Sequence, residues 1–85
     1  MRDIHIGKII LQKLDEKERS IAWLARQINC DGSNLGRSLK NNPHIYSELL
    51  FRISIALEED LFVIYSEKIK ETLWHENSKI YRKPP

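Results

Sequence analysis

The sequence predicts an all-α fold, a compact bundle of five short helices that contains a helix-turn-helix. Apolar side chains recur at intervals of three and four residues in five segments, which is the spacing of helices with one buried face. Capping and helix-ending residues separate these segments. Each segment is too short to be stable alone in water, so packing the five apolar faces around one core is the simplest solution.

The first two predicted helices occupy residues 6–17 and 21–28. Ser20 is a good N-cap for the second helix, and Asn29 at its end tolerates a left-handed backbone. The expected inward faces consist of Ile6, Ile9, Ile10 and Leu14 in the first helix and Ile21, Leu24, Ala25 and Ile28 in the second.

The third predicted helix spans residues 32–40. Asp31 can cap it, because a carboxylate accepts hydrogen bonds from the free N–H groups of a first turn. Pro43 ends this helix and biases the preceding Asn42 towards an extended backbone. The large apolar residues of the helix are Leu35 and Leu39.

Two more helices are predicted, one that Ser47 caps and one over residues 61–74 that Asp60 caps. Their expected inward residues are Leu49, Leu50, Ile53, Ala56 and Leu57 in the fourth helix and Phe62, Tyr65, Ile69 and Leu73 in the fifth. Residues 1–74 are expected to form one domain and residues 75–85 a C-terminal tail. Trp74 and Tyr81 either cap the core or line a dimer seam, and Ile80 is a further docking candidate in the tail.

Composition and cysteine content limit the classes of function. The single cysteine, Cys30, excludes a disulfide within the chain and a cysteine-based zinc site, and we expect it to be a small buried residue in the turn. The three histidines lack metal-ligand spacing, so we expect no metal or cofactor. The first ten residues lack the pattern of a signal peptide, and no apolar stretch approaches about 20 residues. The predicted location is the cytoplasm, without membrane contact.

The charge distribution and the missing catalytic motifs favour a binding protein over an enzyme. Residues 1–57 carry nine Lys and Arg against six Asp and Glu, whereas residues 58–85 carry five against six. The basic excess therefore lies in the part of the chain that contains residues 21–40. The sequence has no Gly-rich phosphate loop and no supported Ser–His–acid or Cys–His arrangement, so we expect no enzymatic activity.

Residues 21–40, with the sequence IAWLARQINCDGSNLGRSLK, have the layout of a helix-turn-helix. The two helices of such a motif cross closely, and Ala25 is the small residue at the expected crossing. In DNA-binding versions the second helix of the motif lies in the major groove. The outward residues expected on that helix are Gly32, Ser33, Asn34, Gly36, Arg37 and Lys40.

These residue types suit a DNA groove. Asn can form a bidentate pair with adenine, Arg can form one with guanine, and Ser can contact a base or a phosphate. Arg26 and Lys40 are placed to meet phosphates, and Ser20 could assist at the start of the second helix. The candidate DNA-contacting residues are therefore Ser20, Arg26, Gly32, Ser33, Asn34, Gly36, Arg37 and Lys40.

The chain resembles the lambda-repressor-like, or Cro/C1-type (XRE), helix-turn-helix DNA-binding domains, especially small single-domain versions from Bacteroidetes genomes. The matching stretches are IHIGKII, SIAWLARQINC, SNLGRSLK and ELLFRISIALEEDLFVIYSE, which together cover about residues 4–67. The resemblance implies a five-helix repressor-like fold, sequence-specific binding of double-stranded DNA by the third helix, and a homodimer. It further implies a transcriptional regulator, with repressor-like action through occupancy of its site.

An alternative from another class is a protein-interaction module on the same fold, such as an antitoxin-like or adaptor protein with little DNA affinity. Asp31, the two glycines of the third helix and the low net charge favour this alternative. Long charged side chains such as Arg37 and Lys40 are also common on solvated surfaces that bind nothing.

Overall fold

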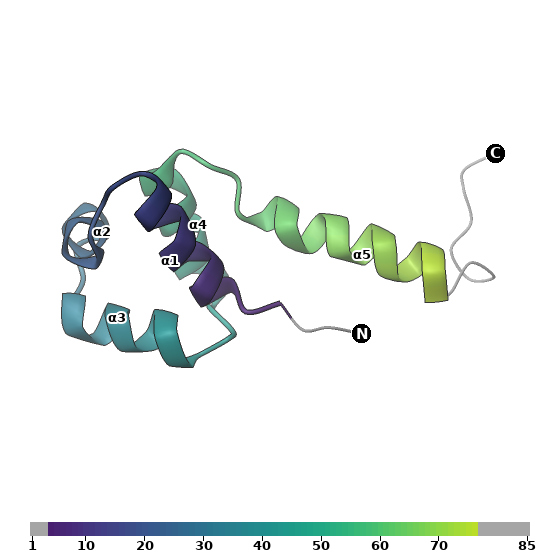
Figure 1. Cartoon of the computed structure of the whole chain (residues 1–85), viewed down its shortest axis with the longest axis horizontal. Coiled ribbons are helices and arrows are strands. Elements are labelled where there is room, and N and C mark those ends of the chain that lie inside the picture. The colour runs from purple at the N-terminus through teal and green to yellow at the C-terminus, as the bar shows by residue number, and fades with distance from the viewer. Residues whose placement is uncertain (1–3, 77–85) are drawn as a thin grey trace.

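The computed structural model describes residues 4–76 and places five α-helices along them (Figure 1). They are α1 (Ile6–Glu16), α2 (Ile21–Ile28), α3 (Gly32–Asn41), α4 (Ser47–Leu57) and α5 (Phe62–Glu76). No strand occurs within residues 4–76. The predicted all-α class with five helices is confirmed, with small differences at the helix ends. Within the same residues, none of the helices combines the length and apolar content needed to cross a bilayer.

The core lies among the first four helices, where α3 packs against α1 and α2, and α2 packs against α4. Leu61, which follows α4, completes it from the start of the fifth segment. Withdrawing each large aliphatic side chain from water stabilises the fold by about 1.5–3 kcal/mol, which offsets the weak intrinsic stability of such short helices. The buried side chains are Ile6, Ile10, Leu14, Leu24, Ala25, Ile28, Leu35, Leu39, Leu50, Ile53, Leu57 and Leu61.

Capping side chains fix most helix starts as predicted. Ser20, Asp31 and Asp60 each accept a hydrogen bond from a backbone N–H in the following turn. Ser47 does not cap α4, so that prediction is wrong. Ser47 is the first residue of the helix, and Tyr46 occupies the cap position without a side-chain hydrogen bond. The chain turns from extended to helical at Tyr46, one residue before the position that the preference of serine for caps indicates.

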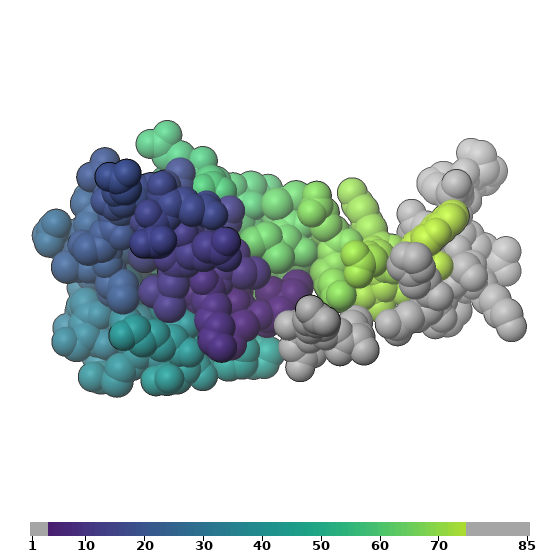
Figure 2. Space-filling view, viewed as in Figure 1, coloured from purple at the N-terminus to yellow at the C-terminus, as the bar shows by residue number. Residues whose placement is uncertain are grey.

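α5 departs from the four-helix body and gives the molecule an elongated shape of 47 × 24 × 23 Å. Figure 1 shows α5 leaving the body after α4, and Figure 2 shows its green-to-yellow surface reaching well beyond the other helices. Phe62 and Ile69, expected to face the core, are 37% and 57% exposed. The helix continues to Glu76, beyond the predicted limit of the domain. The proposed docking residues Ile80 and Tyr81 lie outside the described residues.

Candidate nucleic-acid interface

A three-residue turn joins α2 to α3. Asn29 adopts the predicted left-handed conformation with φ 58° and ψ 58°, and the Cys30 N–H donates a hydrogen bond to the Ala25 carbonyl oxygen at 2.9 Å. Asp31 then caps α3 by accepting from a backbone N–H at 3.3 Å. Ala25 is buried, and a Cβ built on Gly32 would lie 3.7 Å from its methyl carbon. Small residues therefore let the two helices approach closely at the turn.

The outer face of α3 is polar and accessible. The candidate side chains on it are Ser33, Asn34, Arg37 and Lys40, and all four are exposed. A shallow hollow lies between this face and the first turn of α2, with Ile21 and Ala22 on its α2 side and Arg37 and Lys40 on its α3 side. The hydrophilic flank of α3 is therefore open to a ligand.

Of the two glycines of α3, Gly36 is not an outward residue, so this part of the prediction is wrong for Gly36. Gly36 is buried, and Gly32 is partly buried. A Cβ built on Gly36 would lie 3.7 Å from the side chain of Ile21, which places Gly36 against α2. The spacing of polar residues in the sequence of α3 does not reveal which side of that helix α2 covers. Both glycines provide space for packing rather than side chains for recognition.

Asn34 and Arg37 contact each other on the exposed face of α3. The Arg37 guanidinium donates a hydrogen bond from Nη2 to the Oδ1 atom of Asn34. The two residues are three positions apart, and side chains at this spacing lie next to each other on a helix surface. The pair presents the remaining guanidinium N–H groups and the Asn34 amide N–H groups as donors.

The two candidates associated with α2 lie at its opposite ends. The Ser20 Oγ atom accepts a hydrogen bond from the Trp23 N–H at 2.9 Å, so the oxygen serves the cap of α2. Arg26 is exposed and follows Ala22 by one turn on the same side of α2. Arg26 takes no part in the hollow that Arg37 and Lys40 line.

Cys30 is exposed in the turn, which corrects the expectation that it fills a buried position. Ala25 and Gly32 already supply the close contact between the helices, so the thiol stays at the surface. Partial desolvation, assisted by the neighbouring carboxylate of Asp31, raises the pKa of the Cys30 thiol. The thiolate form is disfavoured, as expected for an unreactive cysteine.

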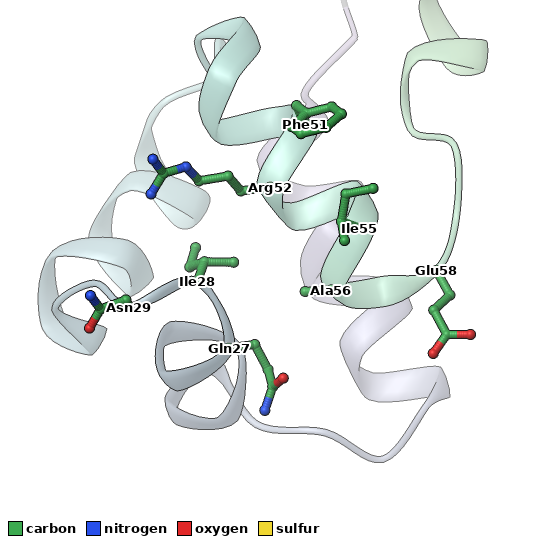
Figure 3. A pocket seen from close by; sticks show the side chains of 8 residues that line it. All are labelled: Gln27, Ile28, Asn29, Phe51, Arg52, Ile55, Ala56 and Glu58. Carbon is green, nitrogen blue, oxygen red and sulfur yellow. The ribbon is translucent and has the colours of Figure 1, made fainter.

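A second exposed surface, on α4, is apolar. Phe51 and Ile55 lie one turn apart and are 56% and 64% exposed. Figure 3 shows both side chains on α4 beside a hollow that reaches across to the end of α2, with Arg52 and Glu58 at its rim. An adjoining hollow is lined by Phe51, Ile55 and Phe62. We call Phe51 and Ile55 the α4 apolar surface, which Phe62 of α5 adjoins.

Sequence reasoning did not identify the α4 apolar surface, although it contains a usable signal. Phe51 and Ile55 are an apolar pair four residues apart, and they lie off the stripe that forms the core. A second apolar pair outside the buried stripe of one helix indicates an additional surface. The inward residues expected on α4 were Leu49, Leu50, Ile53, Ala56 and Leu57, of which Leu50, Ile53 and Leu57 are buried.

No family model, curated protein or solved structure matches the chain. The exposed faces of α3 and α4 are therefore the features from which a function can be inferred.

Proposed function

We propose that the chain binds double-stranded DNA sequence-specifically through α3 and acts as a repressor-like transcriptional regulator. The observation that carries the proposal is the outer face of α3, where Ser33, Asn34, Arg37 and Lys40 are all exposed beside the first turn of α2. The major groove admits an α-helix, and its base edges offer partners for these side chains. The resemblance to lambda-repressor-like domains supports the same function.

In the proposed complex, each polar residue has a role that follows from its chemistry. Ser33, Asn34 and Arg37 face the base edges. Lys40 contacts phosphates through its ammonium charge, and Arg26 contacts them through its guanidinium N–H groups. Ser20 contributes at the start of α2, where backbone N–H groups favour an anion. Gly32 and Gly36, which bring α2 close to α3, act through packing.

A twofold homodimer is part of the proposal. Two copies would place their α3 helices about 34 Å apart, one turn of the duplex. The support for α5 as the contact surface is its exposed Ile69 and the apolar hollow that Tyr65, Ile69 and Leu73 line. A helix of 15 residues that leaves the body gains stability by burying such a surface against an equivalent one.

Duplex binding and its salt dependence test the proposal. Selection from a random duplex pool supplies a binding site, and fluorescence anisotropy then measures affinity between about 50 and 200 mM salt, where a phosphate-contacting protein loses affinity steeply. We expect Arg37→Ala to weaken binding by about 1–3 kcal/mol and to relax preference at one base pair. Lys40→Ala should weaken binding to all sequences and reduce the salt slope by about 1.

Lys70→Ala is the matched control, because Lys70 is an exposed lysine on α5, away from α3. This variant should bind the selected duplex as the unmodified chain does. If Arg37→Ala and Lys40→Ala also leave affinity unchanged, α3 is not the DNA-contacting helix.

The α4 apolar surface favours a second candidate function, a protein-interaction module of the antitoxin or adaptor kind. Phe51 and Ile55 expose apolar area that a solvated protein surface rarely gathers without use. The Asp31 carboxylate at the start of α3 opposes an approaching phosphate, which also favours this candidate. A chain that selects no sequence from the duplex pool would support this function over DNA binding.

A further inference from the structure

We infer that α3 selects guanine rather than adenine at the base pair that faces Asn34 and Arg37, because Asn34 holds Arg37 instead of pairing with a base. The inference rests on the proposed DNA-binding function and names the base that the same face takes. The observation behind it is the hydrogen bond from Arg37 Nη2 to Asn34 Oδ1 on the exposed side of α3.

The contact with Arg37 removes the geometry that Asn34 needs for adenine. A bidentate pair with adenine requires the Asn oxygen to accept from the N6 amino group while the amide nitrogen donates to N7. Both atoms must then face the base edge together. In the structure the oxygen points along the helix to the next turn, where the guanidinium binds it. Asn34 therefore acts as a positioning residue, and its amide nitrogen is left as a donor.

The N–H donors of Arg37 match the hydrogen-bond acceptors of guanine. A guanidinium carries five N–H donors and no acceptor, so four donors remain after the bond to Asn34. The major-groove edge of guanine presents two acceptors, N7 and O6, whereas adenine presents one acceptor and one donor. A side chain with donors alone leaves the adenine amino group unpaired. Because Asn34 already fixes the guanidinium, less side-chain freedom is lost when the base binds.

The remaining exposed side chains of the face differ in donor character, and the Ser33 hydroxyl can both donate and accept. Lys40 is exposed one turn after Arg37 and offers donors alone. Asp31 offers only acceptors, but its Oδ1 atom already accepts from the Ser33 N–H at 3.3 Å. Arg37 and Lys40, which carry donors alone, therefore fit acceptor-rich base edges, which in the major groove belong to guanine.

The test uses the full chain and pairs of duplexes that differ only by guanine or adenine at the selected position. We expect the unmodified chain to select guanine and to prefer it by about 5- to 100-fold. Arg37→Ala should abolish this ratio. Asn34→Ala should keep guanine as the preferred base but reduce the ratio several-fold. Asn34→Asp should show the guanine-to-adenine ratio of the unmodified chain, because the aspartate carboxylate accepts the same hydrogen bond from the Arg37 guanidinium. A ratio within one variant is insensitive to a general loss of affinity.

A double variant separates a coupled pair from two independent contacts. Asn34→Ala combined with Arg37→Ala should behave like Arg37→Ala alone, because Asn34 acts through Arg37. Additive losses, or selection of any base other than guanine at this position, would overturn the inference while leaving DNA binding intact. If the unmodified chain selects no duplex at all, the proposed function and this inference both fail.

Discussion

Gly7 controls how closely α1 and α3 can pack. A Cβ built there would lie 2.2 Å from the Leu39 carbonyl oxygen and 2.9 Å from the Leu39 carbonyl carbon. Backbone atoms cannot rotate away as the end of a side chain can, so a larger residue must separate the two helices. Nearby, the Ile6 N–H donates to the Pro43 carbonyl oxygen at 3.3 Å and ties the start of α1 to the segment after α3.

Gly7→Ala should lower the free energy of unfolding by about 1–3 kcal/mol, although alanine has the better helix propensity. Gly36→Ala is the matched control. Its Cβ would meet only the Ile21 side chain, at 3.7 and 3.8 Å, so we expect no loss and a gain of up to about 1 kcal/mol. Urea denaturation followed by circular dichroism measures both. Equal effects of the two substitutions would contradict the close α1–α3 contact.

Glu59 joins the segment between α4 and α5 to α1. Its carboxylate lies 2.8 Å from Lys13 Nζ and 3.2 Å from Lys17 Nζ. The hydrogen bonds from Lys13 and then Lys17 lower the pKa of Glu59. Because the pKa is lower in the folded chain than in the unfolded one, the ion pairs stabilise the fold above the unfolded pKa. This contribution is lost as the pH falls through the folded pKa.

Glu59→Gln should reduce stability at neutral pH by no more than about 1 kcal/mol, because the side chain is 35% exposed and solvent screens the pair. The difference from the unmodified chain should vanish in acid, once the carboxylate of the unmodified chain is protonated. Denaturation curves at neutral and acidic pH give both values. Glu58→Gln is the control, since none of the ion pairs found within residues 4–76 involves Glu58. A pH-independent difference for Glu59→Gln would contradict the proposed ion pairs.

In the proposed complex, α3 must have a stable first turn and also present an open face to DNA. Asp31 satisfies the first requirement by accepting a backbone hydrogen bond, and a negative charge is favourable at a helix N-terminus. The same residue lines the hollow that Arg37 and Lys40 also line. A carboxylate at this position repels DNA phosphates in the proposed complex. Stability and affinity therefore make opposite demands on residue 31.

Asp31→Asn should separate these two effects. Asparagine caps a helix about as well as aspartate, so stability should change little, while removal of the charge should tighten duplex binding about two- to fivefold at low salt. Asp31→Ala should give a similar gain in affinity but lose about 1 kcal/mol of stability with the cap. Anisotropy titrations and denaturation curves on both variants provide the comparison. Weaker binding by Asp31→Asn would show that the carboxylate contacts the partner favourably.

The path of α5 distinguishes this chain from a closed bundle. Ile64 and Tyr65, in the first turn of α5, are partly buried against the core, and the helix then continues away from it (Figure 1). Ile69 remains 57% exposed. Exposed apolar surface on a projecting helix is stabilised when a second copy covers it, as in the proposed homodimer.

Ile69→Gln should shift the chain from dimer towards monomer, because each dimer would lose two apolar contacts at its centre. Glu67→Gln introduces the same side chain on the opposite side of α5 and should leave the oligomeric state unchanged. Sedimentation velocity over a range of protein concentrations measures the equilibrium. A monomeric unmodified chain, or equal behaviour of the two variants, would contradict dimerisation through this face.

Local sequence patterns were sufficient to predict the five helices, three of their capping side chains and most of the buried core. Capping and apolar spacing act within one or two turns, so Ser20, Asn29 and Asp31 marked the boundaries around α2 and α3 correctly. Local preference misplaced the start of α4 by one residue. The exposure of Ser33, Asn34, Arg37 and Lys40 also follows from the helical pattern, whereas their role in DNA binding stays a prediction.

What lies against each helix face was set by the three-dimensional packing. It turned Gly36 towards α2, left Cys30 at the surface, placed the Leu39 backbone against Gly7, and directed α5 away from the core. Periodicity identifies which side of a helix is apolar, but burial depends on whether another element reaches that side. That depends on contacts between residues far apart in the sequence, which no local pattern contains.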